Sequence, residues 1–180
     1  LVQQILTVSR RHKKERRPIQ LKYILEEALK MLRATLPSTI EVKEVEGNDV
    51  GVINADPAQM HQVIMNLCTN AAHAMQDDGG VLGVEIESVE MGSEYPETGH
   101  LDLPSGSYLR LTVSDAGYGI PRHLVDKIFD PYFTTKDTGE GTGLGLSVVQ
   151  GIVKAHEGTV AVDSEPGKGT TFHVYLPIIQ

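Results

Sequence analysis

Four glycines alternate with other residues in the segment Gly139-Glu-Gly141-Thr-Gly143-Leu-Gly145, which runs directly into an amphipathic stretch at residues 144–156. Glycine has no Cβ, so such a loop can fold its N–H groups around an anion. The start of the following helix adds its dipole to hold the same anion. A flexible linker is also rich in glycine, but linkers rarely lead so directly into an amphipathic helix. The segment therefore predicts a phosphate-binding loop.

The spacing of apolar residues predicts the order of the secondary-structure elements. Helices are expected over residues 21–36, 57–76, 121–128 and 144–156, and strands over residues 40–44, 50–53, 81–89, 108–114, 159–164 and 170–176. Asp56-Pro57 is typical of a helix start, with an N-cap carboxylate before a proline. Because strands and helices do not alternate strictly, we expect an α+β fold, a two-layer sandwich of helices packed on a mixed β-sheet.

The first residues are expected to lie outside this domain. A stripe at helical spacing, typical of a helix that packs on a partner helix, is formed by Leu1, Ile5, Val8 and His12. Pro18 disfavours helical geometry in the residue before it, so it ends the pattern. The sequence thus predicts two parts, a helix end at residues 1–17 and a domain at residues 18–180.

Charge and composition narrow the classes of function. The formal net charge of -8 disfavours nucleic-acid binding, and the basic run at residues 10–17 is interpreted as the solvated face of a helix. A single cysteine, Cys68, cannot form an internal disulfide, which fits a reducing compartment. No apolar run is long enough to cross a bilayer, and no signal peptide opens the chain. We expect a cytoplasmic domain, whether or not the parent protein is membrane-bound.

Two asparagines, Asn66 and Asn70, stand four residues apart within the helix expected at residues 57–76, and therefore share a face. A buried amide needs a partner, and an amide oxygen is a ligand that suits Mg²⁺. Alternatively, both amides bond to backbone groups or water. Taken alone, the pair favours this second explanation.

The segment Asp115-Ala-Gly117-Tyr-Gly119-Ile-Pro121 follows the strand expected at residues 108–114. A carboxylate at a strand end can accept a hydrogen bond from an exocyclic amine such as the amino group of adenine. Gly117 would let a flat ring approach the backbone, and Gly119 would permit a turn with positive φ. The alternative is an Asp-Gly turn that binds no ligand.

Other phosphate-binding, metal-binding and catalytic motifs are excluded by the sequence. Gly167-Lys168-Gly169-Thr170 lacks the upstream glycine of a Walker loop, and no G-x-G-x-x-G opens a helix after the first strand. The seven histidines include no H-E-x-x-H pair, and one cysteine cannot build a thiolate zinc site. No G-x-S-x-G elbow of an esterase is present.

Together with the aromatic and basic segment Phe129-Asp-Pro-Tyr-Phe133-Thr-Thr-Lys136, these motifs match a family in content and in order. Over residues 18–180 the chain resembles the ATP-binding domain of sensor histidine kinases, in the superfamily that includes gyrase, Hsp90 and MutL. The resemblance implies the Bergerat-type ATP-binding fold, with ATP and Mg²⁺ bound.

The resemblance also implies roles for individual residues. Asn70 would coordinate Mg²⁺, and Asp115 would select adenine. Catalytic roles fall to Asn66, one turn before the metal ligand, and to Lys136, a cation that reaches toward the terminal phosphates. The other positions implied in nucleotide binding are His73, Gly117, Gly119, Ile120, Phe133, Gly141, Thr142, Gly143, Leu144, Gly145, Leu146 and Thr170. Core packing explains the aromatic and leucine positions about as well.

Two positions depart from the family pattern. His73 stands where many members carry a lysine or arginine for the phosphates, so phosphate binding would depend more on Lys136. Asn66 stands where the hydrolysing members carry a glutamate that activates water. An amide cannot accept that proton, so rapid ATP hydrolysis is not expected. This departure favours a kinase over a gyrase-like or chaperone ATPase.

The implied function is transfer of the γ-phosphoryl group of ATP to a histidine on a dimerization domain. His12 lacks the acidic residue and proline that accompany acceptor histidines, and residues 1–16 resemble the tail of the second dimerization helix. The fragment is therefore not expected to phosphorylate itself. Implied partners are the dimerization domain of the same protein, a response regulator receiver domain, and a second copy of the parent protein. The alternatives are a nucleotide-sensing pseudokinase, or a serine kinase or ATPase of the same superfamily.

Overall fold

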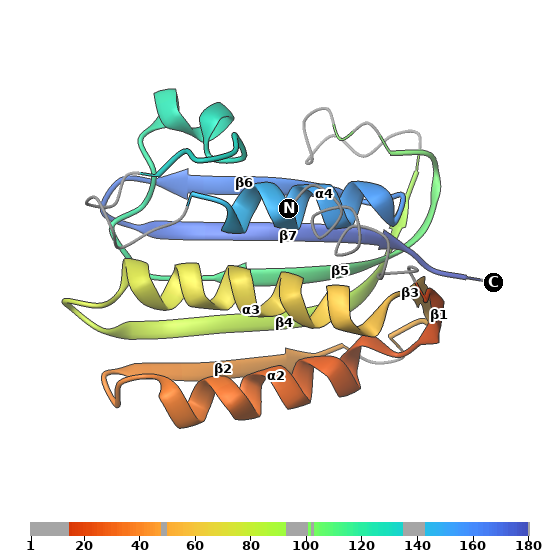
Figure 1. Cartoon of the computed structure of the whole chain (residues 1–180), viewed down its shortest axis with the longest axis horizontal. Helices are drawn as coiled ribbons and strands as arrows, with labels where there is room; N and C mark the ends of the chain where they lie inside the picture. The colour runs from red at the N-terminus through yellow and green to blue at the C-terminus, as the bar shows by residue number, and fades with distance from the viewer. Residues whose placement is uncertain (1–14, 48–49, 93–100, 102, 135–142, 180) are drawn as a thin grey trace, which may run out of the picture.

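The computed structural model describes residues 15–47, 50–92, 101, 103–134 and 143–179. Within them, three helices lie side by side across one face of a five-stranded sheet (Figure 1). The helices are α2 (Leu21–Thr35), α3 (Pro57–Ala74) and α4 (Gly145–Ala155). In spatial order the strands are β2 (Ile40–Glu46), β4 (Gly80–Met91), β5 (Gly106–Ser114), β7 (Gly169–Pro177) and β6 (Thr159–Glu165). The predicted two-layer α+β architecture is confirmed.

The sheet is mixed because one of its four pairings is parallel. β2 and β4 run parallel, whereas β4, β5, β7 and β6 pair antiparallel along the sheet. Two short strands, β1 (Arg17–Ile19) and β3 (Ile53–Ala55), form a separate antiparallel pair. A bridge between Ile53 and Ile178 joins this pair to the end of β7. The 3-10 helix η1 (Arg122–Lys127) lies between β5 and α4 along the chain.

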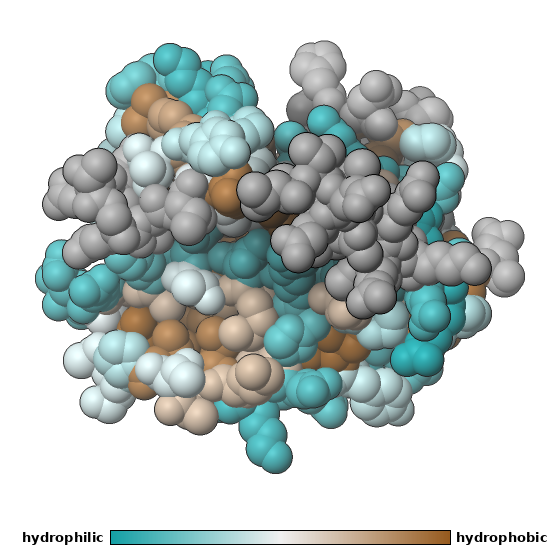
Figure 2. All heavy atoms as spheres, viewed as in Figure 1, coloured by the Kyte–Doolittle hydropathy of each residue, from teal (hydrophilic) through white to brown (hydrophobic). Residues whose placement is uncertain are grey.

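The core fills the space between the sheet and the helices. Apolar side chains line up across neighbouring strands, as in the rows Val84–Val113–Phe172–Val162 and Ile86–Leu111–Val174–Val160. The helices contribute a buried stripe at helical spacing, formed by Leu21, Leu25, Leu29 and Leu32 in α2 and by Met60, Val63, Ile64 and Leu67 in α3. Figure 2 views this helix side, where exposed apolar atoms gather between α2 and α3.

The opposite face of the sheet is polar over much of its area, which explains why one helix layer suffices. Arg110 of β5 forms an ion pair with Glu87 of β4, and Thr112 Oγ1 lies 3.0 Å from His173 Nδ1. At one end a small apolar cluster includes Tyr108, whose hydroxyl donates to the carbonyl of Pro104 at 2.9 Å. Among the described helices, none combines the length and the apolar character needed to cross a membrane.

Some elements have other bounds, or another helix type, than the sequence predicts. The strand expected at residues 50–53 lies at Ile53–Ala55, and the helix expected at residues 121–128 is a 3-10 helix at Arg122–Lys127. Strand β1 was not predicted, because three residues have no periodicity and their pairing partner is distant in sequence. The predicted boundary at Pro18 falls within β1. The apolar stripe of the predicted first helix lies at residues 1–14, outside the described residues.

Helix α3 begins at a well-defined cap. Asp56 is buried, and its Oδ1 accepts hydrogen bonds from the N–H groups of Ala58 (2.9 Å) and Gln59 (3.3 Å). The N–H of Asp56 donates to His156 Nε2 at 3.2 Å, at the end of α4. Because Nε2 accepts this hydrogen bond, the donor nitrogen of the ring is Nδ1, which lies 2.8 Å from the carbonyl of Ile152. The start of α3 is thereby joined to the end of α4.

This cap generates a prediction about stability. Asp56→Ala removes the acceptor for two N–H groups at the start of α3, so the free energy of unfolding should fall by about 1–2 kcal/mol. Urea denaturation followed by circular dichroism measures the change. Asp77→Ala, at an exposed position after α3, is the control. A loss for Asp56→Ala no larger than that of the control would contradict the capping role.

Candidate functional site

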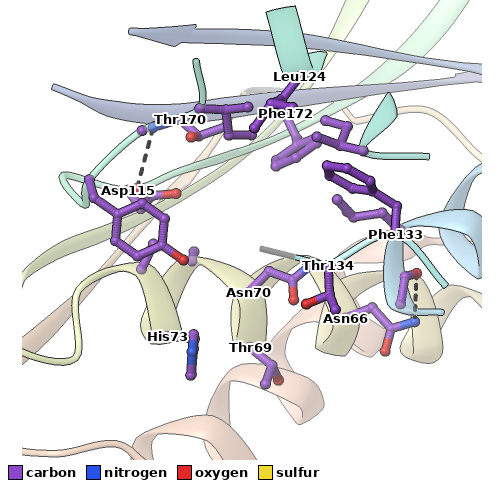
Figure 3. Close-up of a pocket in the computed structure, with 18 of the residues that line it drawn as sticks. Asn66, Thr69, Asn70, His73, Asp115, Leu124, Phe133, Thr134, Thr170 and Phe172 are labelled. Atoms are coloured by element: carbon purple, nitrogen blue, oxygen red, sulfur yellow. Dashed lines mark hydrogen bonds between the residues drawn. The ribbon is translucent and has the colours of Figure 1, made fainter. Parts of the chain in front are cut away.

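A cavity of about 740 Å³ opens between α3, the start of α4, η1, and the strand ends of β5 and β7 (Figure 3). Its size is typical of pockets for small molecules. Its polar side chains come from segments far apart in sequence, namely α3, the end of β5 and the start of β7. The lining includes Asn66, Asn70 and His73 from α3, Asp115 after β5, and Thr170 from β7.

Asp115 is held rigidly at one end of the cavity. Its Oδ1 accepts hydrogen bonds from the N–H groups of Gly117 (2.8 Å) and Thr170 (3.3 Å). Its own N–H donates to the carbonyl of Thr170 at 2.9 Å. Oδ2 has no hydrogen-bond partner among the described residues, so it can accept a bond from a ligand. Burial raises the pKa of Asp115, and the N–H bonds from Gly117 and Thr170 offset only part of that rise.

The segment after Asp115 is fixed by close backbone approaches. Gly119 has φ of +70°, and a Cβ there would lie 2.2 Å from the carbonyl oxygen of Glu165. The predicted positive-φ turn is therefore present. A Cβ on Gly117 would lie 2.4 Å from the carbonyl oxygen of Ala74, and Gly117 does not line the cavity. Gly117 therefore packs closely against α3.

The two asparagines of α3 differ in their partners. Asn66 Nδ2 donates to the carbonyl of Gly145 at 3.2 Å, which joins α3 to the start of α4. The Asn70 amide makes no hydrogen bond with another described residue and points into the cavity in Figure 3. The alternative that each amide bonds to backbone thus applies to Asn66, whereas Asn70 remains available to a ligand.

The start of α4 is suited to an anion. Its N-cap residue, Leu144, has a side chain that cannot accept a hydrogen bond, so the side chain does not cap the first N–H groups of the helix. Gly145 and Leu146, in this first turn, line the cavity. The end of the cavity near Asn70 therefore combines the N–H groups of a helix start, a helix dipole and an amide oxygen. The hydroxyl-bearing Thr69 and Thr134 line the same cavity.

The loop between η1 and α4 is closed at its base. The N–H of Tyr132 donates to the carbonyl of Gly143 at 2.9 Å, and both residues have φ of +66°. A Cβ on Gly143 would lie 2.5 Å from the carbonyl carbon of Tyr132, so only glycine fits there. Before this closure, Phe129 packs edge-on against Phe172, with ring centroids 6.4 Å apart. Phe133 lines the cavity.

The structure brings most of the predicted binding residues together. Those that line the cavity are Asn66, Asn70, His73, Asp115, Gly119, Ile120, Phe133, Gly143, Gly145, Leu146 and Thr170. Gly117 and Leu144 do not line it, and Leu144 is 37% exposed. Lys136, Gly141 and Thr142 lie outside the described residues.

Sequence reasoning missed several lining residues, most of them apolar. They include Thr69, Ala71, Ala74, Tyr118, Pro121, Leu124, Ile128, Thr134 and Phe172. No pattern distinguishes these from ordinary core residues, since Phe172 also belongs to a core row of the sheet. Cys68, although close in sequence to Asn70, is buried, and its pKa is raised to about 12 by that burial. A nucleophilic thiolate at this position is therefore excluded.

Comparisons with known proteins show the family of this chain. Residues 55–180 match the family model described as histidine kinase-, DNA gyrase B-, and HSP90-like ATPase. Sensor kinase CckA of Brucella abortus (strain 2308) is 40% identical over 177 residues, which are 98% of this chain and 18% of that protein. Signal transduction histidine-protein kinase AtoS of Escherichia coli (strain K12) is 34% identical over 179 residues, or 99% of this chain and 26% of that protein.

A solved structure shows the same fold. The catalytic domain of histidine kinase ThkA, in a nucleotide-free form, has a TM-score of 0.71 at 26% identity. The match covers 91% of this chain and 96% of that chain. The chain spans only 18% and 26% of the lengths of its CckA and AtoS relatives. The family match covers well over half of the chain, and this protein therefore belongs to the family of histidine kinase-, DNA gyrase B- and HSP90-like ATPases.

Proposed function

We propose that this chain is the catalytic ATP-binding domain of a two-component sensor histidine kinase. Its substrate would be ATP, whose γ-phosphoryl group passes to a histidine on a dimerization domain. The observation that carries the proposal is a single cavity with a hydrogen-bonded carboxylate at one end and the Asn70 amide beside the start of α4 at the other. The relatives named as sensor kinases support the same assignment.

The adenine end of the cavity is proposed to be at Asp115. Since Oδ1 is occupied by the N–H groups of Gly117 and Thr170, Oδ2 is the oxygen available to the 6-amino group of adenine. A carboxylate only accepts hydrogen bonds, so a donor on the base is required. Ile120, Leu124 and Phe172 provide apolar walls for a flat ring. These residues fit adenine by their chemistry, with an acceptor for its amino group and apolar side chains for its ring.

The phosphate end is proposed to be formed by the first turn of α4 together with Asn70. Backbone N–H groups at Gly145 and Leu146 would bind phosphate oxygens. No group of three His, Cys, Asp or Glu residues that could hold a metal gathers among the described residues. The amide oxygen of Asn70 suits Mg²⁺, which keeps several waters and shares phosphate oxygens. When bound, Mg²⁺ supplies charge neutralisation at the phosphates.

Positioning and charge neutralisation account for most of the chemistry of phosphoryl transfer. Asn66 cannot serve as a base that activates water, because an amide does not accept a proton and its Nδ2 already bonds to Gly145. The site therefore favours transfer to an acceptor histidine over hydrolysis. We propose that phosphate binding is completed by Lys136, Gly141, Thr142 and Gly143. His73 would contribute to phosphate binding in place of the usual lysine or arginine.

The proposal extends to the parent protein. Residues 1–17 would be the end of the second helix of the dimerization hairpin, and residues 18–180 the catalytic domain. The partners would be that hairpin, a second copy of the parent protein, and a response regulator receiver domain. The domain would lie on the cytoplasmic side of any membrane to which the parent protein is attached.

The kinase proposal predicts phosphoryl transfer in trans. Mixing the chain with a dimerization hairpin that carries an acceptor histidine and with γ-labelled ATP should yield acid-labile, alkali-stable phosphate on the hairpin. The chain alone should stay unlabelled. If ATP binds but no phosphohistidine forms, the domain would be a nucleotide sensor, and acid-stable label would indicate a serine kinase.

Asp115→Asn should separate binding from folding. Asparagine keeps an oxygen for Gly117 and Thr170 but turns a donor toward the adenine amino group, so ATP affinity should fall about 10- to 100-fold by calorimetry. Because folding raises the pKa of Asp115, its ionised form opposes folding, and this cost develops as the pH rises from the ordinary pKa of an aspartate to the raised pKa of the folded state. At pH 7 the variant should thus be at least as resistant to urea as wild type.

Asp126→Asn, an exposed substitution in η1, is the matched control and should leave ATP affinity unchanged. Wild-type affinity in Asp115→Asn would disprove the adenine-binding role. Strong loss of urea resistance would instead show that Asp115 is mainly structural.

Asn70→Ala should remove the dependence of ATP affinity on Mg²⁺. Removing the amide deletes the proposed protein ligand, so titrations with and without Mg²⁺ should give affinities within about twofold of each other. Gln62→Ala, at an exposed position of the same helix, should keep the wild-type dependence. A full Mg²⁺ effect in Asn70→Ala would rule out this ligand.

A further inference from the structure

Ser164 lies behind the wall of the cavity at the end proposed to bind adenine. It stands in β6 directly opposite Thr170 of β7 and does not itself line the cavity. Its hydroxyl oxygen contacts three groups: the N–H of Ile120 at 2.7 Å, the carbonyl oxygen of Gly169 at 3.1 Å, and Thr170 Oγ1 at 2.8 Å. One small side chain thus joins the segment after Asp115 to the start of β7.

A count of protons fixes the direction of these three bonds. The N–H of Ile120 can only donate, and the carbonyl of Gly169 can only accept. The single proton of Ser164 is therefore required by Gly169. All three contacts are hydrogen bonds only if the Thr170 hydroxyl donates its own proton to Ser164.

This arrangement determines what Thr170 offers to a ligand. Thr170 lines the cavity and is only 5% exposed, so its hydroxyl has few other partners to choose from. With its proton directed to Ser164, the oxygen presents only lone pairs to the cavity. Asp115 Oδ2 is likewise an acceptor. These two acceptors, Thr170 Oγ1 and Asp115 Oδ2, therefore favour an exocyclic amino group on the base and oppose a carbonyl at the same position.

We propose that Ser164 is a positioning residue that sets the preference of the site for adenine over 6-oxopurines by directing the Thr170 proton away from the cavity. The proposal rests on the proposed function, since it requires a purine at Asp115. Without the Ser164 hydroxyl, the Thr170 hydroxyl has lost its acceptor and rotates freely. It can then donate to the O6 carbonyl of a 6-oxopurine, which the wild-type site rejects.

The test compares ATP with inosine triphosphate, which carries a carbonyl in place of the 6-amino group. Dissociation constants of the 180-residue chain for both nucleotides are measured by calorimetry at one Mg²⁺ concentration. In Ser164→Ala the preference for ATP should fall by about tenfold, equivalent to ~1.4 kcal/mol. Ser164→Thr keeps the hydroxyl and should retain the wild-type preference.

Two further variants separate a directed proton from general loosening. Ser88→Ala removes a serine that also accepts a backbone N–H, from Gly51 at 3.1 Å, away from the cavity, and should leave the preference unchanged. In a Thr170→Val background no hydroxyl proton remains, so adding Ser164→Ala should not change the preference further. This double-mutant comparison isolates the Ser164–Thr170 bond.

Each outcome has a distinct meaning. An equal loss of affinity for both nucleotides, or an unchanged preference in Ser164→Ala, would overturn the positioning role while leaving ATP binding intact. A fall in preference in the Thr170→Val background would also overturn it, because Ser164 would then act by another route. Failure of the wild-type chain to bind ATP would overturn the proposed function itself, and this inference with it.

Discussion

The reciprocal pairing of Asp115 and Thr170 is the interaction on which the site depends. The N–H of Asp115 donates to the carbonyl of Thr170, and the N–H of Thr170 donates back to the Asp115 carboxylate. The pairing occurs where β5 ends and β7 begins, so sheet register places a charged group at the cavity. A half-buried carboxylate with a raised pKa costs folding energy. The fold tolerates this cost because backbone N–H groups satisfy one oxygen.

Close backbone packing around this pair leaves no room for side chains. A Cβ on Gly169 would lie 1.9 Å from the carbonyl oxygen of Asp115, and one on Gly119 would lie 2.2 Å from that of Glu165. Ser164 fills the remaining gap with a single hydroxyl that serves three partners. On the other side of the cavity, the Asn66–Gly145 bond holds α3 and α4 together. The two ends of the site are thus built by different layers of the fold.

Local patterns in the sequence predicted the elements and the motifs, whereas pairings between distant segments required the structure. Helical spacing located α2, α3 and α4, and the glycine at position 119 indicated its positive-φ turn. Strand β1 has no detectable period, and the role of Gly117 depends on contact with Ala74, which lies far away in sequence. Ser164 is an ordinary strand residue in the sequence, and its function emerges only from the β6–β7 register.

The binding mode can be observed in a crystal structure of the chain with a non-hydrolysable ATP analogue and Mg²⁺. We expect the 6-amino group of adenine within hydrogen-bond distance of Asp115 Oδ2, the metal on the Asn70 amide oxygen, and phosphate oxygens at the first turn of α4. A nucleotide bound outside this cavity, or with its base turned away from Asp115, would contradict this binding mode.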